Sequence, residues 1–323
     1  METYFEARPK LVEASAIALG FFDGVHPGHK VVIDTAVSEA RRLGVKAGVV
    51  TFKDHPRALT RGQSPMLLSV IEQRLALFEA LGVEVALVLS FTEELCLKSP
   101  RAYVEDVLVG AMGARSISVG HNHHFGKDRE GDADLLRTLG NDLGFCVNAA
   151  EMVHINGKEV SSSLIRNLVA EGRMQEAMEL LSHPFAVLGE VSRGDGRGRT
   201  IGVPTANLDL YQYQMIPKNG VYAGRARIAS EKAGDNASDC VINVGTRPTF
   251  EEASGGDRPI VEAHLLDCDR DLYGESLEVT FLEFIRDERK FAGAEELTAQ
   301  IKEDIEKARN FLRRDQKGEK LPA

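Results

Sequence analysis

Short apolar runs alternate with helical patterns through the first half of the chain. The runs are short enough for buried strands, and the amphipathic stretches between them have helical spacing. The expected strands cover residues 16–22, 47–52, 83–89 and 116–119, and the expected helices cover about 28–43 and 71–81. Such alternation predicts a Rossmann-like α/β domain, with helices on both faces of a parallel sheet. Ligands bind beyond the carboxyl ends of such strands, so polar residues just after each run are the first candidates for chemistry.

The pattern changes after residues 180–185, where Gly-rich turns and short β-branched or aromatic runs replace the helices. The expected strands now cover residues 185–191, 220–228, 239–244, 261–266 and 276–284. This spacing predicts a closed or nearly closed antiparallel β-barrel. A helix over about 294–314 is expected to cover the barrel, and the polar tail 315–323 is expected to fray. The predicted domains are therefore 1–184 and 185–323.

Length and composition narrow the class of protein. The 323 residues, 43% hydrophobic and 27% charged, fit a globular protein with more than one core. The formal net charge of −10 argues against a general nucleic-acid binder but leaves small anionic substrates possible. Four scattered cysteines fit reduced thiols, no apolar run approaches the ~20 residues that span a bilayer, and the N-terminus lacks a signal-peptide pattern. We expect a cytoplasmic protein without a membrane partner.

The segment F-D-G-V-H-P-G-H, residues 22–29, lies between the first expected strand and the first expected helix. His26 and His29 at a helix N-terminus can both face one ligand and donate to phosphate oxygens, where the helix dipole already favours negative charge. The alternative is that both His cap the helix and satisfy backbone groups, the commoner role of an isolated H-x-x-H. The position directly after a strand, with Gly on both sides, favours phosphate binding.

This segment resembles the H-x-G-H signature of the nucleotidyltransferase superfamily, in the form found in prokaryotic bifunctional riboflavin kinase/FAD synthetases. Three further segments agree with that family: residues 51–56, 119–132 and 161–166. The resemblance implies catalytic roles for His26, His29 and Arg166. It also implies a nucleotide- and phosphate-binding set made of Gly20, Phe22, Asp23, Gly24, Gly28, His55, Asn122, Arg129, Ser161 and Ser163.

Some of these positions also have a physical interpretation of their own. His55 precedes a proline, is held extended and can reach a phosphate, unless it is an ordinary solvated loop His. The run 161–163 reads as a helix N-cap, and Arg166 in the first turn suits a phosphate better than it suits the helix dipole.

The cluster of His121, His123 and His124 invites a metal-site interpretation. No Cys or carboxylate at ligand spacing accompanies it, so we do not expect a metal there. The family has an aromatic residue where His123 stands, and this departure concerns the FMN site.

A Gly-rich basic loop follows the expected strand 185–191. Gly194, Gly196 and Gly198 let the backbone wrap a polyphosphate, while Arg197 and Arg199 supply positive charge. The loop lacks the G-K-[ST] ending of a Walker A loop, and Gly-Arg loops are often simple hairpin turns.

The segment G-V-P-T-A-N-L, residues 202–208, strengthens the phosphate interpretation. Thr205 and Asn207 are two residues apart on an extended chain, so their side chains point the same way and can hold Mg²⁺ with phosphate oxygens. The segment resembles the P-T-A-N box of riboflavin kinases, although Val203 stands where the family more often has an aromatic residue. With further matches around 243–250 and 284–291, the resemblance implies a flavin-binding set of Pro204, Asn243, Arg286 and Phe291.

Glu262 is the expected general base. A carboxylate within an apolar strand must face a polar cavity or carry a large cost of burial. Ordinary alternation along an antiparallel strand also permits a solvent-facing Glu at this position. The resemblance to riboflavin kinases favours the general base over this alternative.

The resemblance covers about residues 16–314 and implies two reactions, both with Mg²⁺ and with ATP as co-substrate. Riboflavin and ATP give FMN and ADP in the C-terminal domain; FMN and ATP then give FAD and pyrophosphate in the N-terminal domain. The expected state is a monomer or weak homo-oligomer with riboflavin, FMN and ATP as partners. One alternative is an enzyme that keeps only one of the two activities. A second alternative is an RNA- or flavin-responsive regulator, and the acidic net charge and the P-T-A-N box both argue against this regulator.

Overall fold

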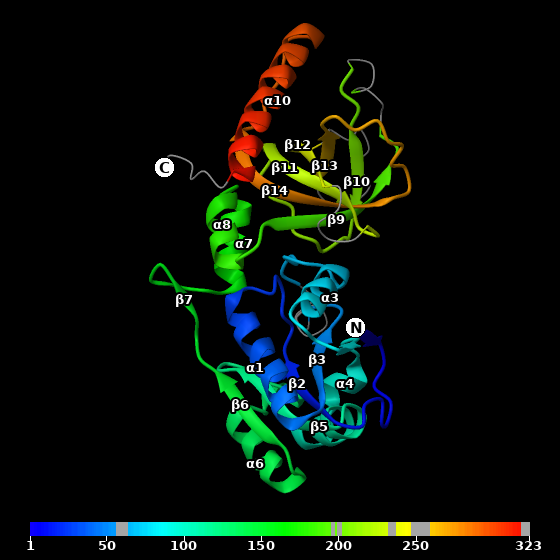
Figure 1. Ribbon diagram of the computed structural model, residues 1–323, viewed down its shortest axis with the longest axis vertical. Helices are drawn as coiled ribbons and strands as arrows, with labels where there is room; N and C mark the ends of the chain where they lie inside the picture. Colours follow the sequence, from blue (N-terminus) through cyan, green and yellow to red (C-terminus); the bar gives the residue numbers. More distant parts are fainter. Residues whose placement is uncertain (56–63, 195–197, 199–201, 232–236, 247–258, 318–323) are drawn as a thin grey trace. The chain divides into compact units, whose positions relative to one another are not determined.

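The computed structural model describes residues 1–55, 64–194, 198, 202–231, 237–246 and 259–317. They form two compact units, Met1–Ser162 and Ser163–Ala323 (Figure 1). Helix α8 (Met174–Leu181) belongs to the second unit. The domain boundary expected after residue 184 stays a prediction.

The first unit is built on a six-stranded sheet in which every pair of neighbours is parallel. Its strand order is β1-β4-β3-β2-β5-β6. The strands are β1 (Glu2–Tyr4), β2 (Ser15–Leu19), β3 (Lys46–Phe52), β4 (Val85–Leu89), β5 (Ala114–Gly120) and β6 (Cys146–Ala150). The sequence pattern missed β1 and β6, because these edge strands lack fully buried positions and so carry no continuous apolar run.

Helices cover both faces of this sheet. Helices α1 (Pro27–Leu43) and α3 (Ile71–Ala80) pack on one face through a core that includes Ala16 and Ala18 of β2. The π-helix η1 (Val104–Ala111) and α6 (Ala133–Leu143) pack on the other face with Ile17 and Leu19. The unit also contains α4 (Glu93–Leu97), α5 (Pro100–Tyr103), η2 (Lys127–Arg129), β7 (His154–Ile155) and β8 (Lys158–Glu159). The expected Rossmann-like fold is confirmed.

The second unit contains a closed antiparallel barrel with strand order β10-β13-β12-β11-β14-β9. The strands are β9 (Phe185–Ser192), β10 (Ala206–Leu210), β11 (Gly220–Ile228), β12 (Ser238–Gly245), β13 (Ile260–Leu265) and β14 (Ser276–Arg286). Along β12 the buried Cys240, Ile242 and Val244 alternate with partly exposed residues, so one face lines the interior. The barrel prediction is confirmed, with β10 as a strand that the pattern alone did not separate.

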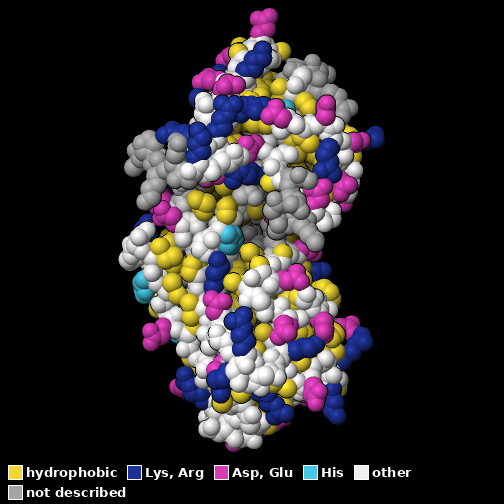
Figure 2. All heavy atoms as spheres, viewed as in Figure 1, with side chains coloured by type: hydrophobic (Ala, Val, Ile, Leu, Met, Phe, Trp, Pro, Cys, Tyr) yellow, Lys and Arg dark blue, Asp and Glu magenta, His cyan; other side chains and the backbone are white. Residues whose placement is uncertain are grey.

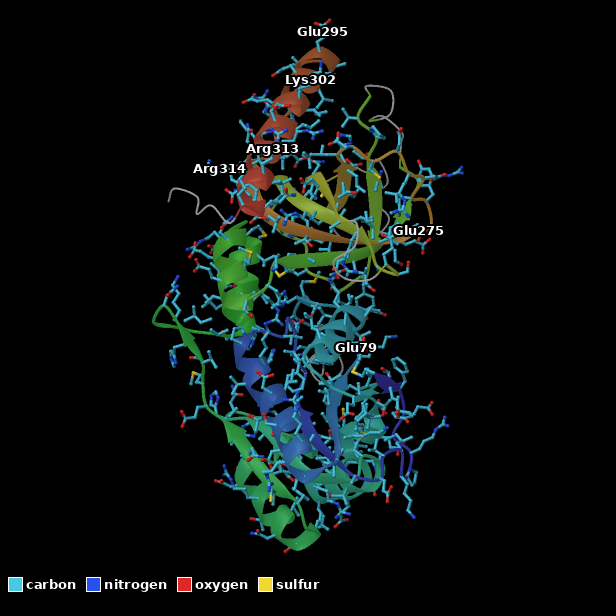
Figure 3. All side chains as sticks on the ribbon, in the orientation of Figure 1. Glu79, Glu275, Glu295, Lys302, Arg313 and Arg314 are labelled. Carbon is cyan, nitrogen blue, oxygen red and sulfur yellow. The ribbon has the colours of Figure 1, made fainter. Side chains whose placement is uncertain are left out.

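Helix α10 (Ala294–Gln316) covers the barrel, as expected. Ala308, Phe311 and Leu312 pack against Ala223 of β11 and Leu282 of β14, and burial of a Phe or Leu side chain contributes about 1.5–3 kcal/mol. Acidic residues occupy the first turn and Arg313 and Arg314 the last, as the helix dipole favours; Figure 3 labels several of these side chains. The helix continues two residues into the tail that was expected to fray.

Acidic and basic side chains are interspersed over the face seen in Figure 2. Within the described part of the chain, no helix is both long enough and apolar enough to cross a membrane.

Candidate functional sites

The turn that follows β2 has an unusual backbone. Phe22 has φ 56°, Gly24 φ 78° and Val25 φ 41°, all in the left-handed region. Bulky and β-branched residues are rare there, and each costs about 1–3 kcal/mol. The strand expected over residues 16–22 is therefore wrong at its end, because the chain leaves the sheet at Leu19 to form this turn.

Asp23 fastens the turn to the segment before α3. Its buried carboxylate accepts hydrogen bonds from the N–H groups of Leu68 (3.1 Å) and Ser69 (3.0 Å). The Ser69 hydroxyl donates to Asp23 (3.3 Å) and accepts from the N–H of Gly24 (2.8 Å). These contacts give Asp23 a part in shaping the turn, and its contact with a nucleotide stays a prediction.

His26 and His29 lie at the start of α1 with their rings stacked. The ring centroids are 3.6 Å apart and the planes differ by 20°. His26 is the N-cap residue, but the cap has no side-chain hydrogen bond within the described helix, so its imidazole does not cap α1. The pair therefore stands at the positive end of the helix dipole, where anions bind.

Two glycines make room for the rings of this turn. A Cβ at Gly28 would lie 3.2 Å from Cε1 of His26. A Cβ at Gly20 would lie 2.8 Å from the ring of Phe22, which in turn meets His29 edge-on at 5.4 Å between centroids. The absence of side chains at both glycines thus helps to set the positions of the two histidine rings. The predicted contact of these glycines with a nucleotide stays a prediction.

The ends of β2, β3 and β5 meet at the carboxyl edge of the sheet. The chain leaves β2 towards β3 and later returns to the other side of β2 as β5, which makes the β2–β5 junction the switch point where such sheets bind ligands. Asn122 follows β5 and is exposed there. His55 follows β3, and its ring lies edge-on to Phe21 at 4.8 Å between centroids. The predicted residues His26, His55 and Asn122 thus come from three adjacent strand ends.

The other predicted residues of this site are placed as follows. Arg129 is exposed in η2. Helix α7 (Ser162–Ala170) begins at Ser162, whose hydroxyl donates to the carbonyl oxygen of Asp23 (3.1 Å). Ser161 precedes that helix, while Ser163 and Arg166 belong to the second unit, and their roles stay predictions.

His123 stands where the family has an aromatic residue. Its ring is within 17° of parallel to that of Phe125, at 6.0 Å between centroids. Its Nε2 atom is enclosed and has no hydrogen-bond partner in the described part of the chain. Burial, helped by the nearby charges of His124 and Arg129, lowers the pKa of His123 to about 4. At neutral pH the residue is therefore an uncharged ring.

In the barrel, Glu262 of β13 lies in a row between Asn207 of β10 and Asn243 of β12. Residues paired across antiparallel strands share one face, and the interior of the barrel is lined by their neighbours Val261 and Ala263. The three polar side chains therefore face outward together. Asn207 is nevertheless 92% buried, and Gly194 lies against its side-chain amide.

Two described glycines of the Gly-rich loop lie close to the predicted metal ligands. A Cβ at Gly194 would overlap the side-chain amide of Asn207, and one at Gly198 would lie 3.5 Å from Oγ1 of Thr205. A hydroxyl, an amide and the Glu262 carboxylate offer the oxygen ligands that Mg²⁺ prefers, so these residues fit the ion. Gly196, Arg197 and Arg199 lie outside the described residues.

Pro204 is held by a residue that the sequence did not single out. Nδ1 of His264 lies 2.7 Å from the Pro204 carbonyl oxygen, and since a carbonyl only accepts, this nitrogen donates. His264 is on the same strand face as Glu262, two residues away. The contact ties the strand of the expected base to the turn that leads into Thr205.

Arg286 and Phe291 were predicted to bind flavin. Nε and Nη2 of Arg286 donate to the buried carboxylate of Asp304 in α10 at 2.8–3.0 Å, and its guanidinium lies 5.7 Å from the ring centroid of Phe291. Arg286 thus anchors α10 to the barrel, and direct contact with flavin stays a prediction for both residues.

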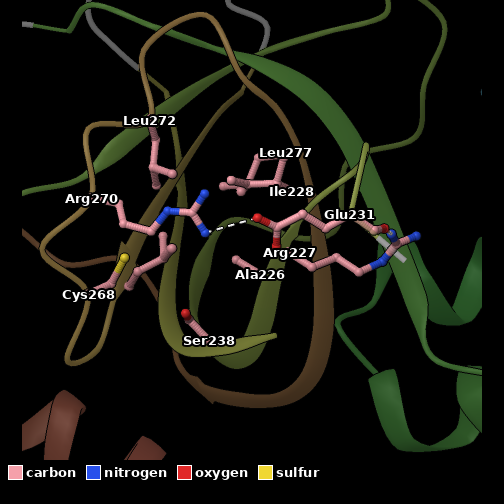
Figure 4. Close-up of a pocket in the computed structure, with 10 residues that line it drawn as sticks. Ala226, Arg227, Ile228, Glu231, Ser238, Cys268, Arg270, Leu272 and Leu277 are labelled. Carbon is pink, nitrogen blue, oxygen red and sulfur yellow. Dashed lines mark hydrogen bonds and ion pairs between the residues drawn. The ribbon is translucent and has the colours of Figure 1, made fainter. Parts of the chain in front are cut away.

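A separate small cavity lies where β11 ends and β14 begins (Figure 4). An ion pair between Arg270 and Glu231 (3.0 Å) crosses it. It is lined by none of the predicted site residues.

Comparison with known proteins identifies both units. Residues 8–164 match the family model of FAD synthetase, and residues 181–312 match that of riboflavin kinase. The bifunctional riboflavin kinase/FMN adenylyltransferase of Escherichia coli K12 is 35% identical over 301 residues, which cover 93% of each chain. The chain belongs to this bifunctional family. The protein of the same name from Bacillus subtilis strain 168 is also 35% identical, over 92% of each chain.

Membership makes the chain a flavin-biosynthetic transferase, with a FAD synthetase domain followed by a riboflavin kinase domain. A solved structure described as "Macrolide-efflux Protein from Streptococcus pneumoniae" has a TM-score of 0.82 and 29% identity, and the match covers 96% of this chain and 99% of that one. That description concerns the other protein; the likeness supports the fold of this one.

Sequence reasoning missed several residues that shape the two flavin-enzyme sites: Ser69, Arg74 and His264. It also gave no sign that Ser162, in the predicted N-cap run, bonds to Asp23. Each of these residues acts through a backbone group or a buried contact in a segment distant in sequence. The helical pattern did not predict the burial of Arg74, because an Arg in an amphipathic helix is usually exposed.

Proposed function

We propose that residues 185–323 phosphorylate riboflavin to FMN and that residues 1–184 adenylylate FMN to FAD, each reaction using ATP and Mg²⁺. The row Asn207–Glu262–Asn243, with Gly194 against Asn207, carries this proposal, since it joins a candidate base to a candidate metal ligand and to a glycine of the predicted phosphate loop. Family membership supports both activities.

In the kinase reaction, Glu262 accepts the proton of the ribityl 5′-hydroxyl as that oxygen attacks the γ-phosphorus of ATP. The bond from the γ-phosphorus to the bridging oxygen breaks, and ADP leaves. Thr205 and Asn207 would hold Mg²⁺, which neutralises charge on the phosphate oxygens. The loop wraps the polyphosphate through Gly194, Gly196, Gly198, Arg197 and Arg199, and the flavin side is formed by Pro204, Asn243, Arg286 and Phe291.

In the adenylyltransferase reaction, a phosphate oxygen of FMN attacks the α-phosphorus of ATP. The bond from the α-phosphorus to the bridging oxygen breaks, and pyrophosphate leaves. Because the nucleophile is already an anion, no general base is needed, and catalysis consists of positioning and charge stabilisation. His26, His29, Asn122 and Arg166 stabilise the transition state, and His55 reaches the phosphates.

We also propose a cytoplasmic location, a monomer or weak homo-oligomer, and no nucleic-acid or membrane partner. The net charge of −10 and the four free cysteines support this view. The substrates are then riboflavin, FMN and ATP.

The direct test is incubation of the full chain with riboflavin, ATP and Mg²⁺, followed by chromatographic separation of the flavins. FMN should form first and FAD should follow. Accumulation of FMN without FAD would reduce the enzyme to a kinase, and conversion of added FMN to FAD without any FMN made from riboflavin would reduce it to an adenylyltransferase.

A further inference from the structure

Arg74 of α3 is an arginine with no exposed surface. Burial lowers its pKa to about 10, against the attraction of Asp23, Glu72 and Asp54, so the guanidinium stays charged at neutral pH. No carboxylate within the described residues forms an ion pair with it. A buried cation of this kind must be stabilised by other groups.

Those groups are the backbone carbonyls of the two loops at the adenylyltransferase site. Nη1 donates to the carbonyl oxygens of Phe21 (2.8 Å) and Phe52 (2.9 Å), and Nη2 donates to that of Lys53 (2.9 Å). Nη1 also lies 3.4 Å from Oγ1 of Thr51, which donates to the same Phe21 carbonyl (3.1 Å). One side chain thus links the segment after β2 to the end of β3 and the loop beyond it.

The ring of Phe21 extends this link to His55. The Arg74 guanidinium lies 4.5 Å from the Phe21 ring centroid, and His55 meets the same ring edge-on. A cation over an aromatic face is attracted by the ring quadrupole, which favours this stacking. The position of His55 therefore depends on Arg74 through both the loop backbone and the Phe21 ring.

The same contacts orient peptide groups. A trans peptide places its N–H opposite its C=O, so a carbonyl of Phe21 or Lys53 that points at Arg74 turns the N–H of Phe22 or Asp54 away from it. The first of these N–H groups begins the strained turn that leads to His26. Arg74 thus fixes the directions of backbone donors as well as the spacing of the histidines.

We propose that Arg74 is a positioning residue of the adenylyltransferase site: it sets the loop that leads to His26 and His29 against the loop that carries His55, so that both meet one polyphosphate. The proposal rests on the function proposed above. Arginine suits the task because its planar fork serves three carbonyls at once, which a lysine ammonium on a flexible stem cannot do in the same geometry.

The test compares Arg74→Lys and Arg74→Met with the same two changes at Arg115, an exposed residue of β5 in the same unit. FAD formation from FMN is measured as kcat and KM for ATP, and FMN formation from riboflavin serves as an internal control on the same chain. ATP affinity is measured by calorimetry without flavin and fitted to two sites, because each domain is proposed to bind ATP. The folded fraction is measured by far-ultraviolet circular dichroism, because the chain has no tryptophan whose fluorescence could report unfolding.

A misplacement of about 1 Å can cost about 100-fold in rate. We expect Arg74→Lys to lose about 10- to 100-fold in kcat for FAD per folded molecule, with less than about a fivefold change in ATP affinity, and Arg74→Met to lose more. FMN formation by both Arg74 variants should match that of the wild type. Both Arg115 variants should match the wild type in FAD and FMN formation.

An Arg74→Lys variant with wild-type kcat would overturn the proposal. So would a loss of FAD formation that is fully accounted for by the unfolded fraction, since Arg74 would then be structural only. Failure of the proposed function gives a different result, because the wild type itself would then form no FAD from FMN.

Discussion

Glu262 of β13 lies directly opposite Asn207 of β10, and Gly194 lies against the side-chain amide of the asparagine. The pairing places a carboxylate beside a buried amide on one outward face of the barrel. The relationship therefore supports Glu262 as the group that accepts the riboflavin proton.

Replacement of Glu262 by Gln keeps the size of the side chain and removes its basicity. We expect FMN formation to fall by about 10²- to 10⁴-fold, the usual contribution of a general base, while conversion of FMN to FAD stays intact. Glu190→Gln, at an exposed position on β9, is the matched control and should change neither rate. Loss of both activities in Glu262→Gln would contradict the assignment of the two reactions to separate sites.

The contact between Gly194 and Asn207 gives a second prediction. In Gly194→Ala the new methyl group would overlap the Asn207 amide, so the loop or the amide must move. If the loop binds the polyphosphate as proposed, the KM for ATP in FMN formation should rise at least about tenfold. Gly293→Ala is the control, because a Cβ there meets nothing within 4 Å. An unchanged KM in Gly194→Ala would show that the loop does not hold the nucleotide.

The main elements of the fold and the location of both candidate sites could be predicted from the sequence, but the contacts that shape the sites could not. The alternation of β2, α1 and β3 and the barrel strands followed from periodicity, because each carries a buried face. The P-T-A-N box and the H-x-x-H segment located the candidate sites. The hydrogen bonds that hold those sites in shape could not be predicted. The Asp23–Ser69 and His264–Pro204 contacts join residues 46 and 60 positions apart and leave no periodic signal in the sequence. The left-handed turn at Phe22 and Val25 was hidden for the same reason, because tertiary contacts override local preference there.

The stacked histidines give a third prediction. His26→Asn keeps a polar side chain but removes one ring of the stack, and with it the donor that we propose for the α-phosphate. FAD formation should fall by about 10²- to 10³-fold, as for loss of one oxyanion donor, and FMN formation should be unchanged. His154→Asn, at an exposed position on β7, should leave both rates at the wild-type level. Wild-type FAD formation in His26→Asn would remove His26 from the catalytic group.

The Arg286–Asp304 pair gives a fourth prediction, which concerns stability. The Asp304 side chain is 3% exposed, so Arg286→Met leaves a buried carboxylate with Gln300 as its remaining described donor (2.8 Å). Removing one partner of a buried pair costs about 3–5 kcal/mol, whereas replacing both by apolar residues is often neutral. Urea unfolding should show that loss in Arg286→Met and recovery of most of it in Arg286→Met/Asp304→Leu.

The same double variant tests whether Arg286 also contacts flavin. Restored stability with riboflavin affinity still reduced would mean that the guanidinium binds the flavin directly. If affinity returns together with stability, the role of Arg286 is limited to anchoring α10.

The low pKa of His123 gives a prediction on pH. Its folded-state value of about 4 lies below the ordinary 6.5, so protonation favours the unfolded chain. The stability that the neutral ring contributes is complete above about pH 6.5, falls as the pH drops towards 4 and is lost below that. Integrated between pH 7 and pH 5, the loss is about 2 kcal/mol for this one group.

His123→Phe keeps a ring beside Phe125 and removes the titration. Between pH 7 and pH 5 the variant should lose about 2 kcal/mol less stability than the wild type, measured by native-state hydrogen exchange of the β5 amides, which reports the first unit. His121→Phe, at an exposed position in the same loop, should follow the wild type. Equal losses in His123→Phe and the wild type would mean that the imidazole gains a proton in the folded protein without cost, and the ring would then be open to solvent rather than enclosed.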